Sequence, residues 1–346
     1  MEMPVINELP KTDLIILQET PEEQNYDFMP KSFDDYLGQE VLKEKLKMYT
    51  HAAKMRGEAL DHMLLFGPPG LGKTTLSQIM AQVMQVGIKI CSGPMMERTG
   101  DLVSILSSLE PRSILFIDEI HRMPTHVEEV LYTAMEHFRV DVIIGQGPGA
   151  QSLNLPIHPF TLIGATTQSG KISAPLRSRF GITERLDFYT DEELQKIVLQ
   201  SARFLELAMT EDAALRIGRC ARGTPRIAKK LLRRVRDFAQ VQHKNKADDA
   251  ITEKALTFLG IDHEGLTQVD NLILYKLMEH FNGGPVGLET LASLIAEDKE
   301  TIEAVYEPFL LRKGYLEKTP RGRQIPHKKL PFLQKKYFGQ NTLLST

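Results

Sequence analysis

Cysteine is scarce in this chain of 346 residues: only Cys91 and Cys220 occur, and they stand far apart in the sequence. That spacing fits neither a metal site nor a redox pair, so both are predicted to be reduced structural thiols. No apolar run approaches the roughly 18 residues that a membrane-spanning helix needs. The acidic N-terminus, with only the short apolar stretch "LIIL", lacks the pattern of a secretory signal. We therefore expect a soluble, cytoplasmic protein with no membrane segment.

The chain also lacks a strong excess of one charge. It has 42 Lys and Arg residues and 45 Asp and Glu residues, which give a formal net charge of −3. Such a balance gives no global nucleic-acid signature, so any basic surface that binds phosphates must be local. Hydrophobic residues make up 42% of the chain, which is enough for two or three domains with cores of their own.

Short apolar segments alternate with helical patterns between residues 31 and 190. Strands are predicted within residues 62–67, 87–92, 113–118 and 160–167. Strands that alternate with helices imply parallel pairing, with helices on both faces of the sheet. Residues 139–157 break this order with a Gly/Pro turn, "GQGPG", and predict a β-hairpin that stands out from the α/β core.

The rest of the chain predicts four further parts. Residues 1–30 are polar and interrupted by prolines, which indicates an extended or mobile arm. Residues 191–262 are helical in pattern and form a second domain. Residues 263–330 combine three helices with a hairpin, which is the pattern of a winged helix, and residues 331–346 form a tail.

The segment "GPPGLGKTT", Gly67–Thr75, matches the phosphate-binding loop G-x-x-x-x-G-K-[ST] and lies between an apolar strand and a helix. Glycines let backbone N–H groups surround phosphates, and the helix N-terminus favours negative charge. Lys73 is expected to contact the β- and γ-phosphates, and the Thr74 hydroxyl to bind Mg²⁺. The expected nucleotide contacts of this loop are Gly70, Gly72, Lys73, Thr74 and Thr75.

The segment "ILFIDEIH" places Asp118 and Glu119 at the C-terminal edge of a strand, where open α/β sheets bind ligands. Asp118 is expected to hold Mg²⁺, and Glu119 to orient or deprotonate the attacking water. "DEIH" also matches the D-E-x-H box of another helicase class. His121 is then either a residue that couples hydrolysis to motion or a histidine satisfied at a helix start.

The motifs "GPPGLGKTT", "LFIDEIH", "LIGATT", "LRSRFG" and "GTPRIAKKLLRRVRDFA" together resemble the AAA+ ATPases, and more narrowly the RuvB family of bacterial Holliday junction motors. The resemblance runs in order from about Phe28 to Arg323. It implies an α/β ATPase core, an all-helical lid at 191–262 and a winged helix at 263–330. In this family the segment that matches residues 139–157 docks on RuvA, the junction-binding partner.

The resemblance also implies roles residue by residue. Thr167, at the end of the fourth strand, matches a polar sensor of the γ-phosphate, and Arg226 of "GTPR" matches a second sensor. Arg179 matches the arginine finger, which in this family acts on the ATP of the neighbouring subunit. Positions that line the nucleotide site in the family correspond here to Glu136, His137, Phe138 and Tyr189.

One position departs from the family pattern. The family usually has an arginine before a Pro-Lys pair, where it contacts nucleotide, whereas this chain has Met29 before Pro30 and Lys31. At this position, Phe28 and Met29 can contact the nucleotide only through backbone or apolar atoms.

Two arginines of "SAPLRSRFG" lie one residue apart after a proline. A finger needs a long, permanently charged side chain on a firm support, and it accelerates phosphoryl transfer by about 10³ to 10⁵ in well-studied cases. Arg179 is the candidate, while Arg177 fits a support at a subunit boundary or a surface charge equally well.

Residues 312–336 hold nine basic side chains against one acid, Glu317. Such a local density binds phosphates even in a slightly acidic chain. The tip of the wing is "EKTPRGR", where the resemblance places DNA contacts at Lys318 and Arg323, with Arg321 beside them. Backbone contacts of this type position a duplex without reading its sequence. The preceding helix is acidic in its first half, which argues against base reading in the major groove.

The resemblance implies an ATPase that uses ATP and Mg²⁺, assembles into a ring, expected to be a hexamer, around duplex DNA and drives branch migration of four-way junctions with a RuvA-type partner. The nearest alternative is a replication initiator with the same ATPase and winged-helix plan, which uses ATP as an assembly switch. A non-hydrolysing AAA+ scaffold is disfavoured, because Lys73, Asp118, Glu119 and Arg179 are all present.

Overall fold

The computed structural model describes residues 28–144, 151–243 and 245–339. Most of the predicted arm, the "GQGPG" turn and the end of the tail lie outside these residues. The described chain divides into two compact units. The first contains Phe28–Ile197 and Gly223–Arg226, and the second contains Val198–Arg222 and the described residues from Ile227 onward.

A five-stranded parallel sheet forms the centre of the first unit, in the order β2-β3-β6-β1-β7. Its strands are β1 (Met63–Phe66), β2 (Ile88–Ser92), β3 (Ile114–Asp118), β6 (Thr161–Thr166) and β7 (Ile182–Arg185). Four of these strands were predicted and are confirmed. The edge strand β7 was not predicted, because its sequence ITER alternates between half-buried and exposed residues and carries two charges.

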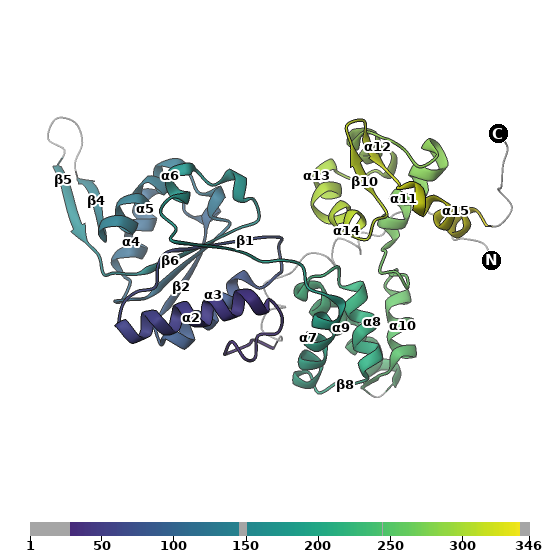
Figure 1. The fold of residues 1–346 in the computed structure, drawn as a ribbon, viewed down its shortest axis with the longest axis horizontal. Coiled ribbons are helices and arrows are strands. Elements are labelled where there is room, and N and C mark those ends of the chain that lie inside the picture. The colour runs from purple at the N-terminus through teal and green to yellow at the C-terminus, as the bar shows by residue number, and fades with distance from the viewer. Residues whose placement is uncertain (1–27, 145–150, 244, 340–346) are drawn as a thin grey trace. The chain divides into compact units, whose positions relative to one another are not determined.

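Helices cover both faces of this sheet (Figure 1). On one side lie α2 (Glu40–Arg56) and α3 (Lys73–Met84), and on the other α4 (Thr99–Ser107), α5 (Thr125–His137) and α6 (Ala174–Arg177). The second face is held by a buried apolar cluster to which Leu115 and Leu162 of the strands, Leu131 of α5 and Leu176 of α6 all contribute. Burying a leucine side chain contributes about 1.5–3 kcal/mol, so this cluster fixes α5 and α6 on the sheet.

Short 3₁₀ turns join some of these elements: η2 (Gly93–Met95), η3 (Ile120–Arg122) and η5 (Ser169–Lys171). Between α5 and β6, the strands β4 (Arg139–Ile144) and β5 (Gln151–Pro156) pair antiparallel, with Val140 opposite Leu155. This hairpin projects beyond the central sheet (Figure 1).

The helical lid contains α7 (Asp191–Phe204), α8 (Glu211–Cys220), α9 (Pro225–His243) and α10 (Asp249–Phe258). Two of these helices begin at capping side chains, since Thr210 accepts from the Ala213 amide and Asp248 from the Ile251 amide. A pair of two-residue strands, β8 (Ala208–Met209) and β9 (Lys246–Ala247), adds a short parallel ladder that the sequence did not predict.

The C-terminal part is a winged helix, as predicted. It contains α11 (Gln268–Phe281), α12 (Leu288–Ile295) and a third helix of three segments: α13 (Lys299–Thr301), the π-helical η6 (Ile302–Tyr306) and α14 (Glu307–Arg312). Pro308, which has no N–H to donate, lies in the first turn of α14, two residues after the π-helical segment ends. The wing is formed by β10 (Glu317–Thr319) and β11 (Gly322–Gln324).

After the wing come the turn η7 (His327–Lys329) and helix α15 (Leu330–Phe338). Leu333 of α15 is fully buried in the same apolar cluster as Leu274 of α11 and Leu291 of α12. In the described part of the chain, no helix is both long and apolar enough to cross a membrane.

Candidate nucleotide site and DNA-binding surface

The phosphate-binding loop connects the end of β1 to the first residue of α3. Gly70 and Gly72 have φ angles of +76° and +98°, which side chains other than hydrogen rarely tolerate. A Cβ at Gly72 would lie 2.7 Å from the Tyr36 hydroxyl. Local geometry therefore requires glycine at these two positions, independently of any ligand.

Lys73 is the first residue of α3, and its ammonium donates to the carbonyl oxygens of Gly67 at 2.8 Å and Pro68 at 2.9 Å. Burial lowers the pKa of Lys73, the carboxylates of Asp118 and Glu119 oppose that shift, and Arg226 adds to it. Asp118, Glu119 and Arg226 thus lie close enough to the Lys73 ammonium to shift its pKa.

Asp118 is the last residue of β3, and its Oδ1 accepts a hydrogen bond from the Glu119 amide at 2.9 Å. Glu119 follows in a left-handed conformation, with φ of 47°, which turns the chain at the C-terminal edge of the sheet. The acid pair therefore lies at the edge where open α/β sheets bind ligands.

A hydrogen-bonded network surrounds the Glu119 carboxylate. Thr167 donates to its Oε2 at 3.1 Å, and the His121 Nδ1 lies 3.1 Å from the same oxygen. The Nδ1 atom also lies 2.9 Å from the Thr166 hydroxyl. Burial lowers the pKa of His121, so its imidazole is neutral at pH 7. These contacts satisfy the His121 ring within the site, and a role in coupling hydrolysis to motion stays a prediction.

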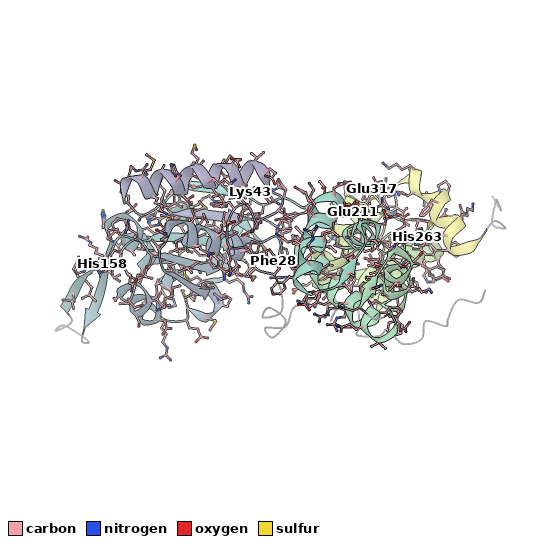
Figure 2. The ribbon with its side chains drawn as sticks, turned by 90° about the horizontal axis from the view of Figure 1, so that it is seen from below. Phe28, Lys43, His158, Glu211, His263 and Glu317 are labelled. Atoms are coloured by element: carbon pink, nitrogen blue, oxygen red, sulfur yellow. The ribbon has the colours of Figure 1, made fainter. Side chains whose placement is uncertain are left out.

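Tyr189 lies beneath the phosphate-binding loop together with Tyr36. Tyr36 was not predicted from the sequence, because no motif marks it. The two hydroxyls lie 2.7 Å apart, and each lies 3.2 Å from the Leu71 carbonyl oxygen. Burial raises the pKa of both phenols, so both stay neutral. Lys43 of α2, labelled in Figure 2, lies on the same segment of chain as Tyr36. Its ammonium donates to the Tyr36 carbonyl at 3.0 Å.

Arg226 lies in the first turn of α9, and its amide donates to the Gly70 carbonyl at 3.4 Å. A Cβ at Gly70 would lie 2.9 Å from the Arg226 Cβ and 2.7 Å from the Thr224 methyl carbon. The "GTPR" segment therefore packs directly on the phosphate-binding loop, and the sensor role of Arg226 stays a prediction.

Arg179 lies in a different part of the first unit. Its Nη2 is 3.1 Å from the Glu136 carboxylate at the end of α5. Phe138 ends α5 in a left-handed conformation and packs near the ring of Phe160, with centroids 6.2 Å apart, while His137 is exposed. The structure thus brings Glu136 together with Arg179, and packs Phe138 into the edge of the core.

Arg177 precedes this cluster on α6, and its guanidinium donates to the Ser169 carbonyl of η5. That contact lies within the chain, and the two interpretations of Arg177 stay open. At the start of the described chain, Phe28 is half-buried and Met29 is 44% exposed. Their expected contact with nucleotide stays a prediction.

Thr74 and Asp118 offer the donor types that Mg²⁺ prefers, a hydroxyl in the first turn of α3 and a carboxylate at the end of β3. Among the described residues, no group of three or more His, Cys, Asp or Glu side chains could hold a metal ion. Mg²⁺ usually binds through one or two protein oxygens plus substrate phosphates and water, so a hydroxyl and one carboxylate fit it.

The wing places Lys318 and Arg323 directly opposite each other on its two strands. Both side chains are held by acids of the third helix. Arg323 Nε lies 2.6 Å from Glu307 and its Nη2 lies 2.7 Å from Glu303, while the Lys318 ammonium lies 2.6 Å from Glu307. Arg321 is exposed at the turn between the strands. A DNA phosphate must therefore compete with these carboxylates for two of the three predicted contacts.

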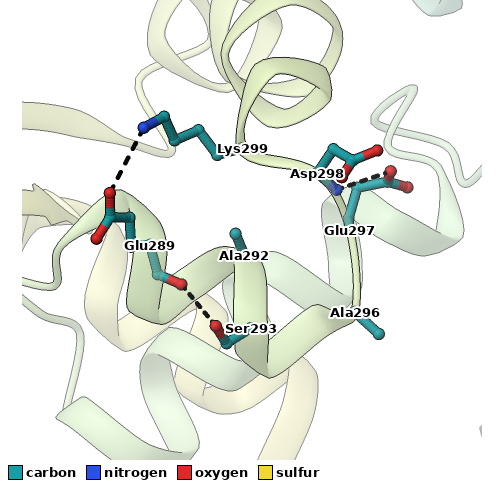
Figure 3. A pocket seen from close by; sticks show the side chains of 7 residues that line it. All are labelled: Glu289, Ala292, Ser293, Ala296, Glu297, Asp298 and Lys299. Atoms are coloured by element: carbon teal, nitrogen blue, oxygen red, sulfur yellow. Dashed lines mark hydrogen bonds and ion pairs between the residues drawn. The ribbon is translucent and has the colours of Figure 1, made fainter.

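An open pocket of about 470 Å³ lies between α12 and α13 of the winged helix (Figure 3). Its lining includes Glu289, Glu297 and Asp298, and a single cation, Lys299, which lies 3.5 Å from Glu289. This mostly acidic lining disfavours phosphate binding in the pocket, and the DNA contacts of the wing stay a prediction.

The parallel sheet with β1 next to β6 and β7, the phosphate-binding loop, the acid pair on β3 and the helical lid define a P-loop ATPase of the AAA+ class. Three family models together match residues 28–334: "Holliday junction DNA helicase RuvB P-loop domain" over 28–186, "RuvB AAA lid domain" over 189–262 and "RuvB C-terminal winged helix domain" over 263–334. The chain therefore belongs to the RuvB family.

Individual relatives agree with this assignment. The "Holliday junction branch migration complex subunit RuvB" of Lactococcus lactis subsp. cremoris is 51% identical over 314 residues, which are 90% of this chain and 94% of that protein. The protein of the same name from Enterococcus faecalis is 53% identical over 294 residues, 85% of this chain and 87% of its own length.

A solved structure, the "Holliday junction branch migration motor" RuvB of Thermotoga maritima, is 47% identical, with a TM-score of 0.77 over 88% of this chain and 98% of that one. These matches do not favour the replication-initiator alternative.

Proposed function

We propose that this chain is the ATP-hydrolysing subunit of a branch migration complex, which moves Holliday junctions in DNA recombination and repair. Support comes from the family, whose models match all three described domains, and from relatives named as subunits of that complex. The chain contributes the parts that such a motor needs: a phosphate-binding loop, a catalytic acid and a basic wing.

In the proposed site, the loop amides and Lys73 bind the phosphates of ATP. Lys73 now donates to two loop carbonyls, and it would exchange these partners for phosphate oxygens. Glu119 activates the attacking water, with Thr167 and His121 orienting its carboxylate. Thr74 and Asp118 would hold Mg²⁺, which would supply positive charge next to the phosphates. Arg226 and Tyr189 contact the nucleotide from the lid side of the loop.

The observation that carries the proposal is the position of Arg179. The cluster that holds it is built on α5 and α6, on one side of the sheet, while Lys73 opens α3 on the other side (Figure 1). The position of Arg179, on the other side of the sheet from Lys73, favours a catalytic site that two copies of the chain complete together. We therefore propose a homo-oligomeric ring, a hexamer, in which Arg179 contacts the ATP of the neighbouring subunit together with Glu136, His137 and Phe138.

The ring would encircle duplex DNA in the cytoplasm, with Lys318, Arg321 and Arg323 contacting the phosphate backbone. The hairpin β4–β5, within residues 139–157, would dock on a RuvA-type partner that binds the four-way junction. We propose domain boundaries at about residues 30, 190, 262 and 330, as the sequence pattern indicates.

Mixing two inactive variants tests the shared site. Lys73→Ala chains cannot use their own nucleotide but keep Arg179, and Arg179→Ala chains keep the loop but lack the arginine. Each variant alone should hydrolyse ATP at a small fraction of the wild-type rate, since an arginine finger contributes about 10³-fold or more. The mixture should recover activity at boundaries that pair the intact halves. A mixture no more active than its components would contradict a site shared between subunits.

A further inference from the structure

The surroundings of Arg179 contain more than its ion pair with Glu136. Its Nη1 donates to the Pro175 carbonyl at 2.6 Å, and its guanidinium carbon lies 4.5 Å from the centre of the Tyr132 ring. At this distance a guanidinium is attracted to the face of an aromatic ring. The Arg179 side chain is only 20% exposed, so this arrangement removes most of it from water.

Tyr132 is itself fixed by its neighbours on α5 and α6. Its hydroxyl donates to the Glu128 carboxylate at 2.6 Å, and the same carboxylate accepts from the hydroxyl of Ser173. Ser173 caps α6, because its side chain accepts from the Leu176 amide. Glu128 is 8% exposed. A buried carboxylate thus joins the tyrosine to the start of the helix that carries Arg179.

Glu128, Tyr132 and Glu136 recur at intervals of four residues on α5, and residues four apart share one face of a helix. We call Glu128, Tyr132 and Glu136, together with Ser173 and Arg179, the α5–α6 cluster. Its two ends differ in burial, since Glu136 is 47% exposed and Glu128 is buried. An exposed ion pair contributes about 0–1 kcal/mol, so a phosphate can displace Glu136 from Arg179 while the ring contact remains.

The donors of Arg179 agree with such an exchange. An arginine carries five N–H donors. One is used by the Pro175 carbonyl and one by Glu136, and the buried Nε has no hydrogen-bond partner among the described residues. One N–H on each terminal nitrogen is left, and displacement of Glu136 would free another on Nη2. The guanidinium therefore keeps donors for a phosphate while Tyr132 and Pro175 hold its plane.

We propose that Tyr132 is a positioning residue, which holds the Arg179 guanidinium in the orientation that meets the phosphates of the neighbouring subunit's ATP. The inference rests on the proposed function, in which Arg179 acts between subunits. It predicts that the ring, and not the hydroxyl, is the part of Tyr132 that contacts the arginine, because the hydroxyl is used by Glu128.

Mixed rings test where Tyr132 acts. Tyr132→Leu is introduced either into the Lys73→Ala chain, which supplies Arg179, or into the Arg179→Ala chain, which supplies the nucleotide site. The first mixture should lose about tenfold in kcat for ATP hydrolysis, within the range that a partly desolvated cation–π contact permits, with KM for ATP unchanged. The second mixture should keep the rate of the parent mixture.

Two further variants separate positioning from folding. Tyr132→Phe in the Lys73→Ala chain keeps the ring and should restore most of the lost rate. Thr133→Val, at the next position of α5, removes a hydroxyl whose one hydrogen bond among the described residues is to the Val130 carbonyl. It should leave the rate as it was.

Each outcome decides the proposal. Equal losses in both mixtures would mean that Tyr132 only supports the fold, and no loss in either would mean that the ring does not position Arg179. A rate increase with Tyr132→Leu would mean that the ring withholds the arginine. Failure of the parent mixture of Lys73→Ala and Arg179→Ala to recover activity would instead overturn the shared site, and this inference with it.

Discussion

Replacing Arg222 by methionine tests how the lid is joined to the winged helix within the second unit. Arg222 is 5% exposed, in a left-handed conformation after α8, and its guanidinium pairs with Asp270 of α11, which is fully buried. It also donates to the Val305 carbonyl at 3.3 Å and lies 4.7 Å from the centre of the Phe309 ring. Methionine would fill much of the volume over Phe309 and remove the charge.

The expected cost follows from the burial of both partners. Removing one partner of a buried ion pair costs about 3–5 kcal/mol, because the other charge is left without compensation. Asp270 would keep hydrogen bonds from the Thr267 amide at 2.8 Å and the Thr267 hydroxyl at 2.9 Å. These bonds satisfy part of the carboxylate, so we expect a loss near the lower end, about 3 kcal/mol.

Hydrogen exchange at the backbone amides of α11 measures this loss locally, which avoids assuming a single unfolding transition for a chain with two units. A loss of about 3 kcal/mol corresponds to exchange about 10²-fold faster. Arg216 offers the matched control in the same unit. It forms two hydrogen bonds with Asp249, both at 2.6 Å. Unlike the Arg222–Asp270 pair, its two side chains are 26% and 43% exposed. Arg216→Met should therefore cost at most about 1 kcal/mol.

The comparison has a clear refutation. If Arg222→Met and Arg216→Met accelerate exchange to the same extent, burial of the Arg222–Asp270 pair does not carry the stability assigned to it. Exchange in α11 that stays within threefold of the wild type would refute the reasoning by itself.

Four other predictions concern the nucleotide site, the wing and the core. Gly70→Ala should weaken nucleotide binding at least tenfold, whereas Gly57→Ala should leave it unchanged. Both glycines have positive φ, but of the two only a Cβ at position 70 meets other atoms within 3 Å. Titration with a fluorescent ATP analogue measures the affinity of each variant. Thr167→Val should lower kcat about tenfold at unchanged KM in a steady-state ATPase assay, since it removes one hydrogen bond to the Glu119 carboxylate, the proposed base. Lys318→Ala should weaken duplex binding and reduce the slope of log K against log salt by about 0.9, as one phosphate contact is lost. Burial lowers the pKa of His62, so the unfolded state binds more protons than the folded state. The free energy of unfolding should therefore fall as pH drops below about 6.5, by up to about 1.4 kcal/mol per pH unit. Urea unfolding should show a flatter pH dependence for His62→Gln than for the wild type.

Specific results would contradict these four predictions. Equal loss of binding in the two glycine variants would point to backbone strain alone. A raised KM with unchanged kcat in Thr167→Val would assign the threonine to binding. An unchanged salt slope in Lys318→Ala would remove it from the DNA surface, and identical pH profiles would show that His62 does not titrate in this window.

The sequence predicted the elements whose signals are local. The phosphate-binding loop, the acid pair after β3 and the three helices of the winged helix each follow from short motifs or from a periodic apolar pattern, and the fold class was confirmed. The strand β7 escaped, because a four-residue edge strand with two charges has no apolar run to mark it.

Contacts between distant parts of the chain were not predictable. Tyr36 and Tyr189 meet beneath the loop although 153 residues separate them, and Arg222 and Asp270 pair across 48 residues. The acids of the third helix were noticed in the sequence as a sign against base reading. Their pairing with Lys318 and Arg323 depends on the register of the wing against that helix, which no local pattern reports.

Movement of a synthetic four-way junction, followed in the presence of a RuvA-type partner and ATP, tests the central claim most directly. The wild-type chain should move the branch point over many cycles of hydrolysis. Glu119→Gln should bind ATP and junction but produce no movement, because it lacks the carboxylate that we propose activates water. Nucleotide-dependent junction binding by the wild type without any movement would contradict the account.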